Sequence, residues 1–376
     1  MAPMKTAAAL FALLLVAPSL ATAQTFPSSA GELKVESVAR GLVHPWSLAF
    51  LPDGRMLVTE RPGRMRIVAS DGKLSPPLPG LPKVHSGGQA GLLDVALDRG
   101  FAQNGTIYFC FNADEGDSVA VARAKLDAGT APRLADVAIV FHQKSPPANG
   151  YNVACRIAQA HDGNLFVTLG DHFAAAKLAQ TLDNDIGKII RIRPDGSIPP
   201  GNPFAGRPDA RPEIWAFGLR NPEGLAFNPA DGKLWEQEHG PMGGDEINII
   251  EKGKNYGWPV VSYGRNYDGT PVGTGKTSAP GMVDPVWHWT PSIAPSGMAF
   301  YTGSLFPSWK GSLFNGALKF MLLSRLELKG DSAVKEERML QGLHERIRDV
   351  RQGPDGALYL LTDNEAGRIL RVSPAR

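Results

Sequence analysis

One structural unit recurs six times along this chain, and the repetition limits the folds open to it. Each copy is an alternating apolar run, a tight turn and a second β-rich run, as in residues 48–58 around Asp53-Gly54. A turn of this kind between two apolar alternations indicates a β-hairpin. The other five turns are Asn104-Gly105, Asp162-Gly163, Asp231-Gly232, Lys310-Gly311 and Asp355-Gly356.

The six hairpins predict an all-β protein, a six-bladed β-propeller with four-stranded antiparallel blades. Turns lie 45 to 79 residues apart, which leaves room for four strands and for loops of unequal length. Only the N-terminal region and residues 177–183 look helical. The alternating run at 33–38 supplies a spare strand that would close the ring with the last blade. A pair of β-sandwiches is the alternative, but one repeated unit favours the propeller.

The first residues predict export. One lysine precedes an apolar run of about ten residues, and Ala21-Thr22-Ala23 follows, the pattern of a cleavable secretory signal. We therefore expect a signal peptide over residues 1–23 and a single propeller domain over residues 24–376, in a periplasmic or secreted protein. The apolar run is shorter than the roughly 20 residues of a spanning helix, so no membrane span is expected in the mature chain.

The charge of the chain narrows the kinds of partner that it can bind. The formal net charge is +2 and charged residues make up 20% of the chain, so neither nucleic acid nor an anionic membrane surface is indicated. A small-molecule partner is favoured.

Cys110 and Cys155 are the only cysteines, and the sequence leaves open whether they form a disulfide bond or stay as buried thiols.

Two segments carry polar groups suited to an ionic ligand. Arg220 and Asn221 follow an apolar strand directly before a proline turn, so both would lie at a strand end and can hold an anion. Residues 238–248 combine glycines with carboxylates. Because calcium accepts backbone carbonyls among its six to eight oxygen ligands, the carbonyls of Gly240 and Pro241 are candidate ligands. Taken alone, a surface ion pair and an acidic turn are the simpler interpretations.

Six segments give these loops a family context. In order, they are GLRNPEGLAFNP, EHGPMGGDEINII, NYGWP, PSIAPSGMAFY, GALK and RIRDVRQGPDG. Together they resemble the soluble pyrroloquinoline quinone (PQQ)-dependent aldose and glucose dehydrogenases over about residues 40 to 373. Any single match is weak, whereas six in order on a sixfold repeat are not expected by chance. The resemblance implies PQQ, a tricarboxylate quinone, lying flat over the propeller's central channel, with Ca²⁺ between PQQ and the protein.

The resemblance also implies roles for individual residues. Fixed donors would meet the carboxylates and quinone oxygens of PQQ, since three negative charges need such partners. These cofactor-binding residues would be Gln89, Arg220, Asn221, Tyr267, Lys319, Arg346 and Arg348. The metal-binding residues would be Gly240 and Pro241 for the cofactor's calcium, and Glu246 and Tyr256, which match a second calcium site of some members. Each has a simpler interpretation as a strand-end charge, a turn residue or a locally packed side chain.

One position departs from the family pattern. Members carry a histidine, the catalytic base, four residues before an arginine that opens the third unit, and this chain has Asn152 before Arg156. The downstream Leu169-Gly170-Asp171 supports the alignment. Asparagine cannot accept the proton of the sugar's C1 hydroxyl, and losing a positioned base commonly costs about 10²- to 10⁴-fold in rate. Candidate replacements are a water held near Asp171 and the side chains of His142, His161, His172 and His239.

Three functions stay open at this point. The first is a PQQ- and calcium-dependent dehydrogenase that oxidises aldoses to lactones and passes electrons to an external acceptor, as a monomer or homodimer. The second is a binding protein that keeps the quinone or sugar site but has lost turnover through Asn152. The third is a calcium-dependent lactonase, because six-bladed propellers also host that chemistry. The cationic residues Lys319, Arg346 and Arg348 favour the quinone.

Overall fold

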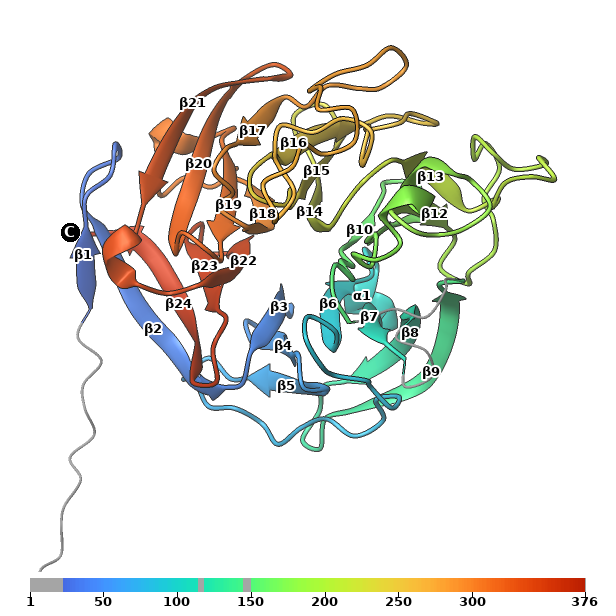
Figure 1. Cartoon of the computed structure of the whole chain (residues 1–376). Coiled ribbons are helices and arrows are strands. Elements are labelled where there is room, and N and C mark those ends of the chain that lie inside the picture. The colour runs from blue at the N-terminus through green and yellow to red at the C-terminus, as the bar shows by residue number, and fades with distance from the viewer. Residues whose placement is uncertain (1–22, 114–117, 145–149, 376) are drawn as a thin grey trace, which may run out of the picture.

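Six antiparallel β-sheets stand around a common axis in the computed structural model (Figure 1). The model describes residues 23–113, 118–144 and 150–375, so most of the expected signal peptide lies outside the described residues. Within these ranges four sheets have four strands, one has three and one has five. The six-bladed propeller expected from the six hairpins is confirmed. No helix in the described ranges has both the length and the apolar character that crossing a membrane requires.

The blades follow one another along the chain. The first contains β3 (Pro45–Phe50), β4 (Met56–Glu60) and β5 (Arg64–Val68). The second contains β6 (Leu92–Leu97), β7 (Thr106–Asn112), β8 (Val119–Asp127) and β9 (Arg133–His142), with helix α1 (Phe101–Asn104) before β7. The third contains β10 (Ile157–Gln159), β11 (Leu165–Leu169), β12 (Lys188–Ile192) and β13 (Ile214–Phe217).

The remaining three blades complete the ring. The fourth contains β14 (Pro222–Phe227), β15 (Leu234–Glu238), β16 (Asp245–Ile250) and β17 (Trp287–Trp289). The fifth contains β18 (Pro295–Phe300), β19 (Leu313–Ala317), β20 (Leu322–Lys329) and β21 (Ser332–Met339). The sixth joins β22 (Ile347–Gln352), β23 (Leu358–Thr362) and β24 (Gly367–Pro374) to the N-terminal β1 (Gln24–Phe26) and β2 (Leu33–Leu42). Short 3₁₀ turns are η1 (Ala176–Gln180), η2 (Pro307–Trp309) and η3 (Gln341–Leu343).

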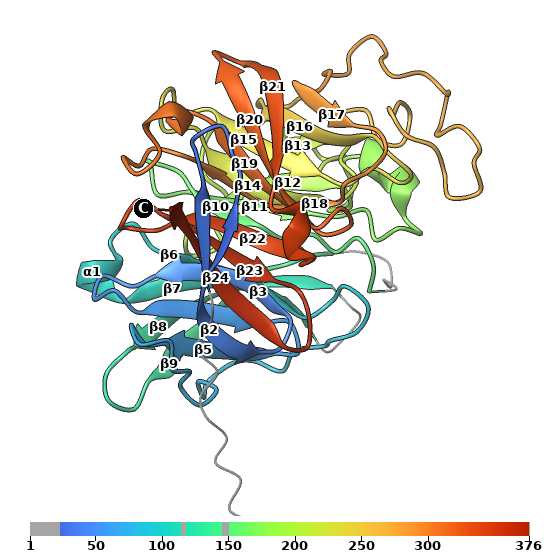
Figure 2. The ribbon, with the colours of Figure 1, turned by 90° about the vertical axis from the view of Figure 1, so that its left-hand side faces the viewer.

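Each predicted turn joins the first and second strands of its blade. In the first blade, for example, Phe50 pairs with Met56 around Asp53-Gly54, and Gly54 has a φ of 85°, which favours glycine. The ring closes as predicted, because β2 pairs antiparallel with β24, with Val35 opposite Val372. Figure 2 shows these two strands side by side. Pairing the two ends of the chain in one blade covers the sheet edge that an open array would expose.

Apolar faces of neighbouring blades pack together to form the core. Tyr301, Trp309 and Phe314 of the fifth blade, for instance, lie in one buried cluster with Leu358 of the sixth. A disulfide bond between Cys110 of β7 and Cys155, just before β10, adds a covalent link between the second and third blades. The sequence left open whether these two cysteines pair, and the structure shows that they do.

Candidate active site

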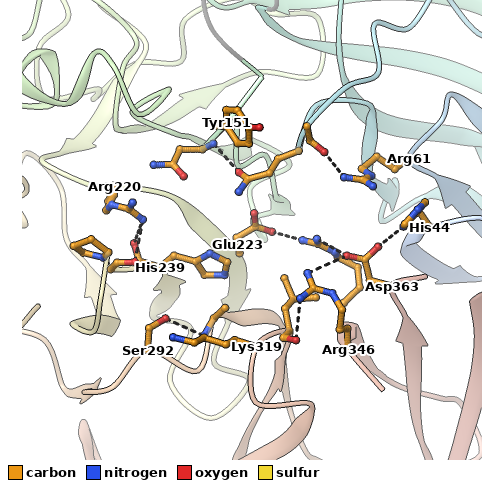
Figure 3. A pocket seen from close by; sticks show the side chains of 18 of the residues that line it. His44, Arg61, Tyr151, Arg220, Glu223, His239, Ser292, Lys319, Arg346 and Asp363 are labelled. Carbon is orange, nitrogen blue, oxygen red and sulfur yellow. Dashed lines mark hydrogen bonds and ion pairs between the residues drawn. The ribbon is translucent and has the colours of Figure 1, made fainter. Parts of the chain in front are cut away.

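A pocket of about 780 Å³ opens where the innermost strands begin. His44, Asn152 and Ala294 line it, and each lies close before the first strand of a blade. His239 and Asp363 also line it, and each directly follows the second strand of a blade. Because every blade has the same up-and-down order, these two positions repeat at one end of the propeller. Figure 3 shows the side chains that converge on this pocket.

Cationic side chains dominate one wall of the pocket. Arg348 is buried and donates to Glu223 at 2.9 Å and to Asp363 at 3.0 Å. Burial alone would lower the pKa of Arg348, but the two carboxylates outweigh burial and raise it. Arg346 is 48% exposed and lies 3.6 Å from Asp363. Lys319 is exposed, and its ammonium has no hydrogen bond or ion pair with a described residue. Arg346 and Lys319 are therefore able to meet an anionic ligand.

A second group of donors lies across the pocket from this wall. The guanidinium of Arg220 is buried and donates to the carbonyls of His239 and Gly240, both at 3.0 Å. Its Nε has no hydrogen-bond partner among the described residues, and the Nε of Arg348 has none either. A buried N–H without a partner is costly, and a bound anion would remove that cost. The pocket therefore fits a polyanionic ligand such as PQQ.

The predicted calcium ligands are carbonyl groups in this part of the wall. Gly240 and Pro241 both line the pocket, and the Gly240 N–H is held by Asp245 at 2.9 Å. The Gly240 carbonyl already accepts from Arg220. No group of three or more His, Cys, Asp or Glu side chains in the described ranges could hold a metal ion. A Ca²⁺ ion here would thus depend on backbone carbonyls and on the oxygens of a bound cofactor.

Asn152 lines the pocket with its backbone in the left-handed region, at a φ of 48°. Its backbone N–H donates to Gln89 Oε1 at 2.6 Å, and its Nδ2 donates to Asp171 Oδ1 at 2.8 Å. Asp171 also accepts from Trp258 Nε1 and from the Phe173 N–H, each at 2.8 Å. Burial raises the pKa of Asp171, while Arg220 and these hydrogen bonds oppose the rise. The amide donor of Asn152 is thus committed to Asp171.

Of the four candidate histidines, only His239 lines the pocket. Its Nε2 lies 2.7 Å from the Pro295 carbonyl, which can only accept, so Nε2 carries the proton and Nδ1 keeps its lone pair. Burial lowers the pKa of His239. His172 is buried and does not line the pocket, and its Nε2 bonds to Gln143 Oε1 at 2.9 Å. His142 and His161 are exposed and do not line the pocket.

The remaining predicted residues lie in three different settings. Tyr267 is 61% exposed at the pocket mouth. Asn221 is fully buried and does not line the pocket, because its amide bonds to the Ala154 N–H and to Glu223, each at 3.1 Å. Asn221 therefore does not contact the pocket itself but connects the segment of Ala154 with that of Glu223. Gln89 lines the pocket beside Asn152.

Glu246 and Tyr256 line a separate small cavity of about 10 Å³ beside the main pocket. Glu246 lies opposite Glu238 in the pairing of β15 with β16. Burial, followed by mutual repulsion, raises the pKa of Glu246 well above its usual range, and burial raises the pKa of Glu238 to about 8. The Tyr256 hydroxyl donates to the Ile249 carbonyl at 2.7 Å. A cation in this cavity would favour ionisation of both glutamates.

The pocket-lining residues that sequence reasoning missed include four with titratable side chains that form ion pairs or hydrogen bonds, namely His44, Arg61, Glu223 and Asp363. Asp363 accepts from His44 Nδ1 at 2.8 Å as well as from Arg348, so it joins the first and last blades. A signal for three of them was present in the sequence. His44 lies just before the first strand of a repeat, and Arg61 and Asp363 directly follow a second strand, positions that a superposition of the six units would have aligned.

Comparison with known proteins shows which family this chain belongs to. Residues 42–371 match the family described as glucose/sorbosone dehydrogenase. The aldose sugar dehydrogenase YliI of Escherichia coli is 44% identical over 348 residues, which cover 91% of this chain and 93% of the relative. The apo-form crystal structure of the soluble aldose sugar dehydrogenase from Escherichia coli has a TM-score of 0.86 at 42% identity, covering 91% of this chain and all of that one.

A structure with a bound cofactor is also similar. The PQQ-bound form of the aldose sugar dehydrogenase from Streptomyces coelicolor has a TM-score of 0.75 at 30% identity, covering 91% of this chain and 98% of that one. These likenesses extend over nearly all of the propeller and confirm the resemblance drawn from the six sequence segments. This chain therefore belongs to the glucose/sorbosone dehydrogenase family, a family of oxidoreductases.

Proposed function

We propose that this protein oxidises aldose sugars to lactones with PQQ and Ca²⁺ bound in the main pocket, and passes the electrons to an external acceptor. The observation that carries the proposal is the set of cations around one pocket, which includes Arg220, Lys319, Arg346 and Arg348. Two of them keep a buried N–H without a partner, and Lys319 has no ion pair with a described residue. An anionic cofactor would satisfy these groups. We also propose that the protein works in the periplasm or outside the cell.

PQQ, when bound, supplies the acceptor for the hydride that leaves C1 of the sugar. The chain's own residues would bind the cofactor's carboxylates and hold the sugar. The C1 hydroxyl must also lose its proton. Asn152 cannot accept that proton, but its amide oxygen can receive the hydroxyl's hydrogen bond. The imidazole of His239 lines the pocket and keeps its Nδ1 lone pair, so we assign the proton to this group.

A titration of purified protein with PQQ and Ca²⁺, followed by anaerobic addition of an aldose panel, tests this function. Bound PQQ whose absorption changes to that of the reduced form is the expected result. Lys319→Met should weaken PQQ binding about tenfold or more, because it removes one charge-assisted contact. Lys310→Met, an exposed lysine in the turn before β19, is the matched control. Absence of PQQ binding in the unmodified protein would overturn the proposal.

One observation favours a second candidate, a binding protein without turnover. The side chain at the family's base position donates to Asp171 and offers no titratable group. Such a protein would bind PQQ in the same titration and leave it oxidised with every sugar. A calcium-dependent lactonase would instead hydrolyse lactones with Ca²⁺ and no PQQ, so one assay without PQQ distinguishes it.

A further inference from the structure

Two residues of the main pocket that the proposed function does not use form a bonded pair. His44 and Asp363 both line the pocket, and Nδ1 of His44 lies 2.8 Å from Oδ1 of Asp363. Burial alone would raise the pKa of Asp363, but Arg348 and His44 outweigh burial and lower it, so Asp363 stays a carboxylate. A carboxylate can only accept, so Nδ1 of His44 carries the proton and Nε2 keeps its lone pair. Nε2 has no hydrogen bond or ion pair with a described residue.

The backbone around His44 holds this imidazole in place. His44 has a φ of 45°, in the left-handed region that is uncommon for residues other than glycine. Its N–H donates to the Asn364 carbonyl, and its carbonyl accepts from the Arg61 N–H, both at 2.9 Å. Asn364 and Arg61 also line the pocket. Strain maintained by surrounding contacts is characteristic of functional segments. Closing the ring does not require this pair, because β2 already pairs with β24.

The pair lies at an edge of the pocket where the wall meets solvent. The side chain of His44 is 25% exposed. Glu365, two residues after Asp363, also lines the pocket and is exposed. Figure 3 shows His44 and His239 on different sides of the pocket. The pocket therefore holds two separate imidazoles, and a proton on His44 has a short way to water.

The proposed oxidation has to dispose of two protons. Conversion of an aldose to its lactone breaks the C1–H bond and the O–H bond of the C1 hydroxyl, and releases two electrons and two protons in total. An external acceptor that takes one electron at a time and no proton leaves both protons in the pocket. His239, whose Nε2 is bonded to the Pro295 carbonyl, has one free nitrogen and can take one of them. A second group must carry protons to solvent before the next turnover.

We propose that His44, oriented by Asp363, takes up at Nε2 a proton that the oxidation releases and passes this proton to solvent. This inference rests on the proposed aldose oxidation. The carboxylate of Asp363 would stabilise the imidazolium while the proton is held. Arg348, at 3.0 Å from Asp363, and Arg346, at 3.6 Å, share that carboxylate and oppose a lasting positive charge on His44, which favours release.

His44→Asn tests the proposal, because asparagine keeps a donor for Asp363 and tolerates a positive φ but cannot take the proton. The acceptor is ferricyanide, which takes one electron and no proton. With PQQ, Ca²⁺ and an aldose that the unmodified protein oxidises, kcat should fall about tenfold or more. Added imidazole, a diffusible proton carrier, should restore part of the turnover, whereas a structural defect would not respond. His344→Asn, at an exposed histidine with a φ of 54° outside the pocket, is the matched control and should leave kcat unchanged.

Two measurements other than turnover separate the possible failures. Nitrogen-15 NMR of the protein without PQQ should show neutral His44 protonated at Nδ1 and bare at Nε2, with the signals identified by their loss in His44→Asn. PQQ affinity and the rate of anaerobic PQQ reduction by the aldose should change less than about twofold in His44→Asn. If PQQ affinity falls as far as kcat, or if neutral His44 carries its proton at Nε2, the proton role is overturned.

The same experiments show whether the proposed oxidation itself is at fault. If the unmodified protein binds PQQ and no aldose reduces it, the oxidation fails and the role of His44 fails with it. If reduction proceeds and His44→Asn turns over at the unmodified rate with ferricyanide, the role of His44 alone is overturned and the oxidation stands.

Discussion

At the scale of single residues, the proposed oxidation depends on which group takes the proton near Asn152. A histidine here would place one ring nitrogen on Asp171, where the amide now donates, and would leave the other as a base. Asn152→His should therefore raise kcat for aldose oxidation about 10²-fold, measured with saturating PQQ and Ca²⁺. Asn152→Gln keeps an amide and is the control. If Asn152→His changes kcat less than threefold, His239 already takes the proton efficiently and the missing family histidine does not limit the rate.

His172 gives a prediction about stability and pH. Burial lowers the pKa of His172 to about 4, from about 6.5 in an unfolded chain. The unfolded chain then binds the proton more tightly, so stability is complete above pH 6.5 and falls as the pH drops toward 4. The loss is on the order of 3 kcal/mol. Urea unfolding at pH 7 and pH 4.5 should show a smaller loss for His172→Gln than for the unmodified chain. His161→Gln, at an exposed histidine, should behave like the unmodified chain.

The sequence predicted pocket residues well where the family motif and the repeat agreed. Lys319, Arg346 and Arg348 all line the pocket, and their contact with a cofactor stays a prediction. It could not predict that Asn221 lies behind the pocket, because a motif records which residue is present and not which way its amide turns. Ion pairs between residues far apart in the sequence, such as His44 with Asp363, could not be predicted either, since nothing local links residues 319 positions apart.

At the scale of elements, the hairpin was predictable because its turn is local. All six turns fall between the first and second strands of a blade, where a glycine that follows Asp, Asn or Lys allows the reversal. The outer strands were less predictable, because their pairing depends on neighbours and long loops. The first blade has three strands in place of four, and the last has five because two come from the N-terminus.

The segment that carries Asn152 is held in place by the disulfide bond. Ala154 and Cys155 have φ values of 57° and 83°, so the backbone here is strained and depends on its contacts. Closing the loop between the two cysteines, 45 residues apart, should contribute about 2–4 kcal/mol. Cys110→Ser with Cys155→Ser should lower the free energy of unfolding by that amount, measured by urea denaturation, and weaken PQQ binding. Unchanged PQQ affinity would show that the Gln89 and Asn221 contacts suffice.

At the scale of the whole molecule, Arg156 connects the blades at the axis. Its guanidinium donates to the Glu223 carbonyl of the fourth blade at 2.7 Å and to Asp349 of the sixth at 3.0 Å. It also lies 3.4 Å from Asp94 of the second blade and 4.0 Å from the Trp46 ring centroid of the first. One side chain of the third blade thus contacts four other blades. The contacts that hold the ring together therefore also stabilise the pocket.

Replacing Arg156 should therefore cost stability and disturb the pocket together. Arg156→Met removes a buried cation and leaves Asp94 and Asp349 with Arg351 as their remaining cation, at 3.0 and 2.8 Å. Because breaking a buried ion pair typically costs about 3–5 kcal/mol, we expect a loss near 3 kcal/mol in urea unfolding. Arg207→Met breaks an exposed pair with Asp209 and should cost less than about 1 kcal/mol. PQQ affinity should fall in Arg156→Met alone, since Glu223 and Arg348 contact Arg156 and line the pocket. Equal losses in the two variants would mean that the axis network is not what joins the blades.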